Sequence, residues 1–240
     1  MNEVTGETQR VGLTPEQEVA LGQQSAPQMI RQHGGISNNQ AGNLEVQAVG
    51  QRLVRNSIAA QSPYQYQFYL LADPSVVNAF ALPGGQIFIT EALYQRLENE
   101  GQLAGVLGHE IGHVIERHSA ERIAKQQLTE GLLGAVIAGS GSYDAARAGQ
   151  VVGQLVNMSY GREDELESDG WGIEIMCESG YNPHDLKGVM RILASASGGQ
   201  APPEFMSTHP NPDNRIERIE AKIAADYPNY ETECASPELR

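Results

Sequence analysis

The chain has 240 residues, of which 16 are Lys or Arg and 30 are Asp or Glu, so its formal net charge is −14. This length suits one sizeable domain. With 40% hydrophobic and 19% charged residues, the composition excludes a disordered chain and a charged coiled coil. The acid excess, without any cluster of Lys and Arg, argues against nucleic acid or an anionic membrane surface as a partner. No apolar run approaches the ~20 residues that a spanning helix needs, so we expect no transmembrane segment.

The first predicted elements are two helices that follow a polar, flexible segment at residues 1–12. Thr14 is placed as the N-cap, and Pro15 as the first residue, of a helix that ends near residue 33. A second helix is predicted around residues 44–58, where apolar side chains recur on one face.

Three short β-strands are predicted next. In residues 64–71, alternate apolar side chains point to one side, which is typical of a strand. Residues 78–82 and 86–89 are two further strands, and the Pro-Gly-Gly at 83–85 separates them.

Helices dominate the rest of the chain. They are predicted at residues 91–98, 99–127, 128–138, 143–159, 162–179, 183–196 and 212–226. We therefore expect one α+β domain at residues 13–228, mainly helical with a small sheet, followed by a tail at 229–240.

The sharpest motif is the run His109-Glu110-Ile111-Gly112-His113. On a helix, positions i and i+4 share a face, so both imidazoles can bind one metal ion while Glu110 holds a water beside it. A solvated His/Glu helix face is the alternative. The apolar half of the helix ahead of the motif favours a buried site instead. Three glycines on this helix further indicate that another backbone or a substrate approaches closely: Gly105, Gly108 and Gly112.

A catalytic zinc ion takes three protein ligands and leaves one position for water. His118 lies about 140° around a continuous helix from His113, so we expect that it cannot join the site. Glu165 and Asp169 share one face of a later helix. One carboxylate can bind the metal, and the other can accept a hydrogen bond from a ligand imidazole. The alternative, an acidic helix start that favours the helix dipole, accounts for their acidic neighbours better than for Glu165.

The motif with its downstream Glu-x-x-Ser-Asp resembles the gluzincin metallopeptidases. Further matching segments are Asn78 to Ile87, Ser207-Thr208-His209-Pro210 and Arg215-Ile216. They narrow the resemblance to the family of the CAAX prenyl protease and the HtpX membrane protease, and within it to the soluble bacterial envelope branch of BepA and LoiP. The resemblance covers most of the chain. It implies a zincin-like fold with one Zn²⁺, an HExxH active-site helix, and zinc-dependent hydrolysis of peptide bonds.

The resemblance also assigns roles to single residues. It implies that His109, His113 and Glu165 bind zinc, that Glu110 is the catalytic base, and that Asp169 supports the ligands. It further implies that a polypeptide substrate lies along the edge strand: Asn78, Ala79, Phe80 and Ala81. A short strand with unpaired backbone groups is suited to this on physical grounds as well, although an ordinary hairpin is compatible with the same residues.

His209 and Arg215 lie in the last matching segments. We expect His209 to stabilise the oxyanion, or alternatively to block the resting zinc as a fourth ligand; a plain turn histidine is the third possibility. Arg215 is expected to orient this loop or assist the oxyanion, and otherwise to pair with carboxylates on the terminal helix. His33 and His184 are interpreted as surface residues.

The resulting hypothesis is a metalloendopeptidase acting on unfolded or misassembled envelope proteins. The alternative is a chaperone-like polypeptide-binding protein in which proteolysis is weak or self-inhibited by His209. A structural zinc site is less favoured, because such sites usually fill four positions with Cys or His. The resemblance suggests the bacterial periplasm or envelope, and a lipoprotein, in which case Cys177 and Cys234 would form a disulfide; two free thiols are the alternative. For the apolar insertion at 119–160 we expect core packing, with a lid, a substrate-binding wall or an oligomer contact as the alternatives.

Overall fold

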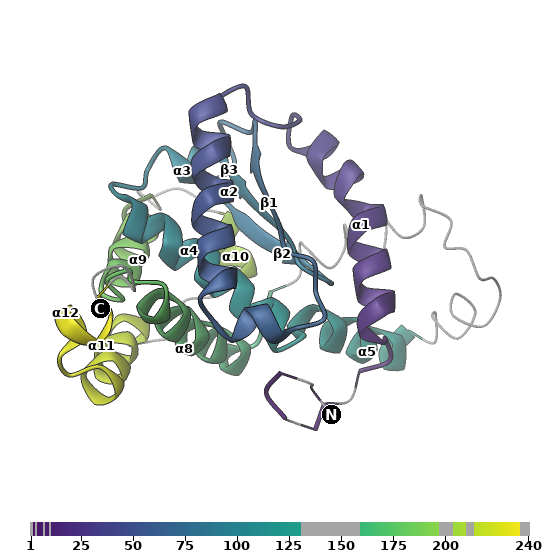
Figure 1. The fold of residues 1–240 in the computed structure, drawn as a ribbon. Coiled ribbons are helices and arrows are strands. Elements are labelled where there is room, and N and C mark those ends of the chain that lie inside the picture. The colour runs from purple at the N-terminus through teal and green to yellow at the C-terminus, as the bar shows by residue number, and fades with distance from the viewer. Residues whose placement is uncertain are drawn as a thin grey trace.

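The computed structural model describes residues 2, 4–6, 8, 9, 11–130, 159–196, 204–209 and 214–235. In these ranges helices surround a three-stranded sheet (Figure 1), which confirms the mainly helical α+β class. The strands are β1 (Gln67–Leu71), β2 (Ala79–Leu82) and β3 (Gln86–Thr90). The helices are α1 (Pro15–Gln32), α2 (Gln40–Arg55), the short 3-10 helix η1 (Ile58–Gln61), α3 (Glu91–Tyr94), α4 (Glu100–Ile115), α5 (His118–Glu130), α8 (Arg162–Glu178), α9 (Asp185–Ala196), α10 (Glu204–Thr208), α11 (Arg215–Asp226) and α12 (Tyr230–Glu233).

The first helix begins as its sequence predicts. The Thr14 hydroxyl accepts a hydrogen bond from the Gln17 backbone N–H at 3.3 Å, and the Gln17 side chain accepts one from the Thr14 N–H at 2.9 Å. This reciprocal pair satisfies two backbone donors that a helix start would otherwise leave open.

The sheet has β3 at its centre, in the order β1-β3-β2. β1 pairs with β3 in parallel, and β2 pairs with β3 antiparallel, with Phe80 opposite Phe88. β2 therefore lies at an edge of the sheet. The turn from β2 to β3 requires glycine, because Gly84 has φ +78° and an added Cβ would lie 2.4 Å from the Cα atom of Val19.

Both faces of the sheet are buried, and Figure 1 shows the sheet between α2 and α1. Ile87 and Ile89 of β3 join the larger core, which includes residues of α2 and α4. Phe88, between them in sequence, joins a smaller core with residues of α1. This alternation follows from the two-residue repeat of a strand.

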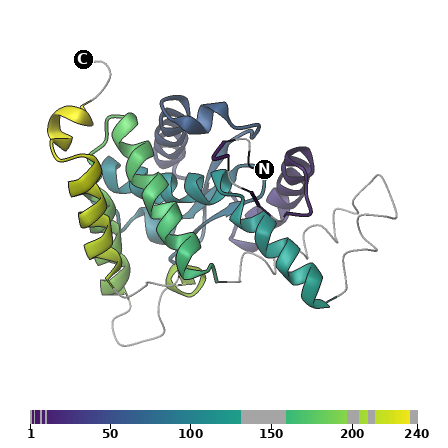
Figure 2. The ribbon, with the colours of Figure 1, turned by 90° about the horizontal axis from the view of Figure 1, so that it is seen from below.

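α4 and α8 approach closely at glycine, as predicted from the glycines of α4. An added Cβ on Gly112 would lie 3.0 Å from the Cα atom of Ser168, and one on Gly172 would lie 3.3 Å from the His109 backbone nitrogen. The backbone that approaches α4 is therefore that of α8. Seen from below, α8 runs beside α4, and α11 packs on α8 (Figure 2).

The continuous helix predicted at 99–127 is wrong. α4 ends at Ile115 and α5 begins at His118, with Arg117 in the left-handed region at φ +58°. The Arg117 guanidinium is ion-paired with Glu18 of α1 and donates to the Leu13 carbonyl at 2.7 Å. Because these partners come from far away in the chain, the sequence near residue 117 gives no signal for the break.

The C-terminal part is tied to the rest by a disulfide between Cys177 of α8 and Cys234, so the free-thiol alternative is wrong.

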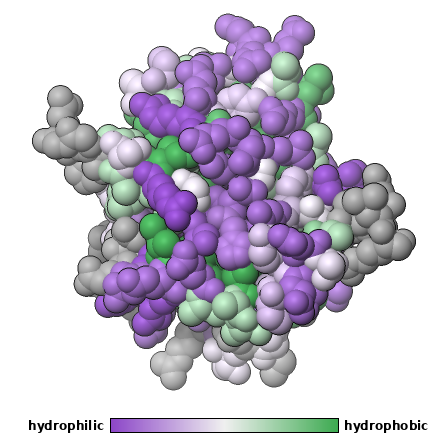
Figure 3. Space-filling model, turned by 90° about the vertical axis from the view of Figure 1, so that its left-hand side faces the viewer, coloured by the Kyte–Doolittle hydropathy of each residue, from purple (hydrophilic) through white to green (hydrophobic). Residues whose placement is uncertain are grey.

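The short helices α10 and α12 were not predicted. Most of the predicted helices at 128–138 and 143–159, and of the apolar insertion, lies outside the described residues. None of the helices in the described part is both long and apolar enough to cross a membrane. The face beside α9, α11 and α12 is mainly hydrophilic, with small separate apolar areas (Figure 3).

Candidate metal centre and active site

α4 carries the His-Glu-x-x-His motif into the interior of the protein. His109, Glu110 and His113 are each at most 1% exposed. The N-terminus of α4 is capped by Asn99, whose side chain accepts from the Gln102 backbone N–H at 2.8 Å. The motif is therefore on a buried helix, and the alternative of a solvated His/Glu face is wrong.

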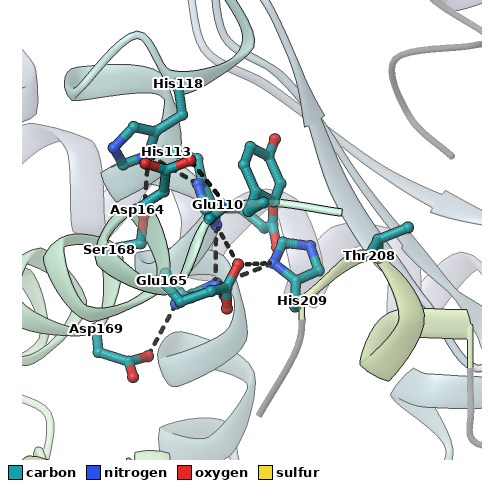
Figure 4. A network of polar contacts seen from close by, with 12 residues as sticks. Glu110, His113, His118, Asp164, Glu165, Ser168, Asp169, Thr208 and His209 are labelled. Carbon is teal, nitrogen blue, oxygen red and sulfur yellow. Dashed lines mark hydrogen bonds and ion pairs between the residues drawn. The ribbon is translucent and has the colours of Figure 1, made fainter. Parts of the chain in front are cut away.

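Four buried side chains converge on one point: His109, His113, Glu165 and His209. One potential ligand atom from each lies within 4.8 Å of every other. The Nε2 atoms of His109 and His113 are 3.1 Å apart, and the His209 Nδ1 atom lies 3.3 Å from His109 Nε2. Figure 4 shows His113, Glu165 and His209 directed toward one another.

These separations fit a metal ion. Ligand atoms ~2.0–2.1 Å from a tetrahedral zinc ion are roughly 3.3 Å from one another. Glu165 matches this as well, since its carboxylate oxygens lie 3.5 Å from His113 Nε2 and 3.6 Å from His109 Nε2. Nitrogen and carboxylate donors with no sulfur are the set typical of catalytic zinc sites.

The protonation of the cluster suits metal binding. Burial lowers the pKa of His113 well below its usual value, which favours the neutral imidazole that binds metals. Burial alone would raise the pKa of Glu165, but His209 and His113 hold it well below the usual range. Glu165 is therefore ionised and able to act as a ligand.

Glu110 lies beside the cluster without a hydrogen-bond partner for either carboxylate oxygen. Its Oε1 atom lies 3.6 Å from His209 Nε2, which also has no hydrogen-bond partner. Burial raises the pKa of Glu110, against the opposing effect of His209 and His109. Buried polar atoms without hydrogen-bond partners are rare. The Glu110 carboxylate and His209 Nε2 are therefore free to bond to a ligand or substrate.

Asp169 and Arg215 contact the cluster through His109 and Glu165. The Asp169 Oδ1 atom lies 3.0 Å from His109 Nδ1, and Arg215 donates to both Asp169 oxygens at 2.6 and 2.7 Å. Arg215 Nη1 also lies 2.9 Å from Glu165 Oε2. Burial would raise the pKa of Asp169, but Arg215 and His109 hold it below its ordinary value. Arg215 does pair with carboxylates, but they belong to α8, so the expectation that its partners lie on the terminal helix is wrong.

His209 follows α10 directly, and its backbone N–H donates to the Phe205 carbonyl at 2.7 Å. The Phe205 ring stacks on the His209 ring with centroids 4.3 Å apart. The side chain is fully buried and belongs to the four-residue cluster, which is not expected of a plain turn histidine. Pro210 and the residues up to 213 lie outside the described part of the chain.

Two residues next to His113 were missed by the sequence interpretation. The Tyr160 ring stacks on the His113 ring at 3.8 Å, and burial raises the pKa of its phenol. His118 Nδ1 lies 2.9 Å from His113 Nδ1. The expectation that His118 points away assumed one continuous helix, whereas the break at Arg117 returns it to His113. It lies outside the four-residue cluster but contacts one of its members.

The edge-strand residues Asn78 to Ala81 lie near this site. The Phe205 N–H donates to the Val77 carbonyl at 3.2 Å, which joins α10 to the residues ahead of β2. The Asn78 side chain donates to Glu204 at 3.2 Å, and its Oδ1 atom is buried without a partner. β2 pairs only with β3 among the described strands, yet its residues are at most 3% exposed. The edge is thus unpaired but covered.

Two other histidines lie outside the cluster and are partly buried rather than fully exposed. His33 Nδ1 lies 3.2 Å from an Asp73 carboxylate oxygen, and the His184 ring contacts the Tyr230 ring edge-on with centroids 4.5 Å apart. Neither histidine is therefore the plainly exposed surface residue that was expected.

Comparison with known proteins gives the family. Residues 40–223 match peptidase family M48. The beta-barrel assembly-enhancing protease of Yersinia pestis is 33% identical over 215 residues, which are 85% of this chain and 43% of that protein. Its counterpart from Escherichia coli K12 is 30% identical over 226 residues, 90% of this chain and 45% of that protein.

A relative from a eukaryote also matches. The mitochondrial metalloendopeptidase OMA1 of Schizosaccharomyces pombe is 33% identical over 183 residues, 74% of this chain and 52% of that protein. The chain therefore spans about half the length of these curated relatives. The family expected from the sequence motifs is confirmed, and because the matched residues make up most of its length, the chain belongs to peptidase family M48.

Proposed function

We propose that this chain is a zinc-dependent endopeptidase in which Glu110 is the general base. The observation that carries the proposal is the cluster itself. Three ring nitrogens and a carboxylate oxygen gather at the separations of metal ligands, next to the buried Glu110 carboxylate, which has no hydrogen-bond partner. Membership of a peptidase family supports the same activity.

Each residue then has a defined part in the reaction. A zinc ion held by His109, His113 and Glu165 would acidify a water and polarise the scissile carbonyl. Glu110 accepts the proton of the attacking water, whose oxygen bonds to the carbonyl carbon. Glu110 then passes the proton to the amine nitrogen as the carbon–nitrogen bond breaks. The raised pKa of Glu110 suits both steps, because the group must take up and then release a proton.

His209 is proposed to donate from Nε2 to the oxyanion that forms on the carbonyl oxygen. Its unpartnered Nε2 atom, beside Glu110, supports this role. The opposite ring nitrogen supports the alternative: Nδ1 lies 2.9 Å from Glu165 Oε1, in the position of a fourth ligand. In that state His209 would exclude water from the site.

The substrate is proposed to be an extended polypeptide that adds to the free edge of β2, along Asn78 to Ala81. An unpaired strand edge offers backbone donors and acceptors for such pairing. The residues of β2 are at most 3% exposed. This binding therefore requires that the residues covering the free edge of β2 move aside.

Degradation of casein by three proteins tests the mechanism: wild type, Glu110→Gln and His209→Ala. We expect Glu110→Gln to lose activity while it keeps its zinc. If this variant degrades casein at the wild-type rate, Glu110 is not the base. Loss of activity in His209→Ala supports the oxyanion role, whereas a gain supports the blocking role.

A second candidate function is a chaperone-like protein that binds polypeptides on the same fold, with proteolysis weak or blocked. The placement of His209 Nδ1 among the ligand atoms and the covered edge of β2 favour it. Binding of unfolded casein by wild type, without cleavage even in His209→Ala, would support this candidate over the peptidase.

The substrates are proposed to be unfolded or misassembled envelope proteins, and the location the bacterial periplasm or envelope. Two relatives are named for assisting beta-barrel assembly, which supports both points. We also propose a lipoprotein, because Asn2-Glu3-Val4-Thr5-Gly6 resembles the segment just after the lipid-bearing Cys in envelope lipoproteins of this branch. Mass spectrometry of the protein from its source cells tests for the acyl chains.

A further inference from the structure

The two ring nitrogens of His113 face different surroundings. Its Nε2 atom belongs to the metal cluster, whereas its Nδ1 atom lies 2.9 Å from His118 Nδ1. The chain of contacts continues, because His118 Nε2 lies 3.1 Å from the Glu167 carboxylate. His118 is 2% exposed, whereas the Glu167 side chain is about half exposed at 51%. In Figure 4, His118 lies on the side of His113 away from His209.

The Glu167 carboxylate, at the end of this series of contacts, selects the tautomers of both histidines when His118 is neutral. An ionised carboxylate only accepts hydrogen bonds, so the proton of a neutral His118 is on Nε2. His118 Nδ1 then carries a lone pair and accepts the hydrogen bond from His113 Nδ1–H. His113 is left with its lone pair on Nε2, which is the atom directed into the cluster.

His109 has the same arrangement in a shorter form. Its Nδ1 atom lies 3.0 Å from Asp169, which leaves Nε2 for the metal. Asp169 reaches its histidine directly because it lies one turn from Glu165 on α8. Glu167 lies about 200° around α8 from Glu165, so it can reach the second histidine only through an intermediate residue. His118, brought back by the left-handed turn at Arg117, fills that place.

We propose that His118 is a positioning residue for the metal site: together with Glu167 it fixes the tautomer and ring orientation of His113 as a zinc ligand. The proposal rests on the zinc site of the proposed function. The weaker contact of Ser168 Oγ with His118, at 3.4 Å, is compatible with it, because a hydroxyl can share the lone pair as a second donor.

Zinc affinity provides the test, measured in the full chain by competition with a chromogenic chelator. The variants are His118→Ala, His118→Gln and Glu167→Ala. Glu163→Ala is the matched control, because Glu163 is an exposed carboxylate at the start of the same helix. Loss of a hydrogen-bond partner behind a ligand typically weakens metal affinity ~10–100-fold. We expect that range for His118→Ala and a smaller loss for Glu167→Ala. His118→Gln should recover part of the affinity through its amide oxygen, and Glu163→Ala should match wild type.

The stability of the metal-free proteins separates positioning from packing. If His118→Ala and Glu167→Ala bind zinc as tightly as wild type, the inference is overturned while the zinc site stands. A lower melting temperature of metal-free His118→Ala, with unchanged zinc affinity in Glu167→Ala, would assign His118 to packing and also overturn it. If wild type itself binds no zinc, the proposed function fails first and the inference with it.

Discussion

Glu110 is a buried carboxylate whose environment bears directly on the pH dependence of the reaction. Burial raises its pKa, and a general base works only when it is deprotonated. As the pH falls, activity should therefore be lost above the ordinary glutamate pKa of about 4.3, rather than below it. The rate of peptide cleavage between pH 4 and pH 8 checks this. An acid limb at or below the ordinary value would contradict it.

Asp169 forms a buried ion pair with Arg215, and its lowered pKa links stability to pH. A group whose pKa is lower in the folded state stabilises the protein above its unfolded pKa, about 3.9. This contribution is lost as the pH falls through the lowered folded value. Asp169→Asn should reduce the free energy of unfolding of the metal-free protein by about 3–5 kcal/mol at pH 7, and by less in strong acid.

Urea unfolding of wild type and Asp169→Asn at pH 7 and pH 3 measures this difference. A loss that is equal at both pH values would mean that the carboxylate acts through its shape and not through its charge.

At the residue scale, spacing alone predicted much of the cluster. His109 and His113 follow the i, i+4 rule within one helix, and Glu165 and Asp169 follow it within another. Spacing could not find Tyr160 or His118, because neither shares an element with the residue that it contacts. The Tyr160 backbone N–H donates a hydrogen bond to the Thr208 carbonyl of α10. No sequence pattern links these two segments of the chain.

At the scale of elements, the contact between α4 and α8 depends on a missing side chain. Gly112→Ala would bring a Cβ to 3.0 Å from both the Cα atom and the carbonyl oxygen of Ser168. These two neighbours are backbone atoms, which have little room to shift. We expect a loss of about 1–3 kcal/mol in the free energy of unfolding and weaker zinc binding, because the helix that carries Glu165 is pushed away.

Gly108→Ala is the control on the same helix. Its Cβ would meet Gly172 at 3.4 Å, an ordinary contact, and alanine favours a helix over glycine by about 1 kcal/mol. It should be neutral or stabilising in urea unfolding. Equal destabilisation by both variants would show that the close approach at Gly112 is not the cause.

The elements themselves were predictable where the signal is local. Thr14 and Pro15 mark the start of α1. The alternation from Tyr64 to Leu70 predicts a strand whose four alternate side chains are buried in one core, although β1 begins only at Gln67. The boundary between α4 and α5 was not predictable, because the stretch reads as one helix. Its interruption depends on Glu18, which is 99 residues away in sequence.

At the scale of the whole molecule, the disulfide between Cys177 and Cys234 closes a separation of 57 residues. A loop of this length should contribute about 4 kcal/mol through the lower entropy of the unfolded chain. We expect Cys234→Ser to unfold at a lower urea concentration than wild type under non-reducing conditions. With reductant the two should unfold alike; a difference that persists would contradict this account.

The left-handed turn at Arg117 also bears on where the catalytic unit begins. The family match starts at residue 40, yet the guanidinium that sets this turn is held by Glu18 and by the carbonyl of Leu13. A fragment trimmed to the matched residues would keep every proposed zinc ligand and the general base. It would nevertheless leave Arg117 without its counter-charge and release His118 from beneath His113. The smallest piece of this chain that retains an ordered metal site should therefore include α1 and the residues just before it.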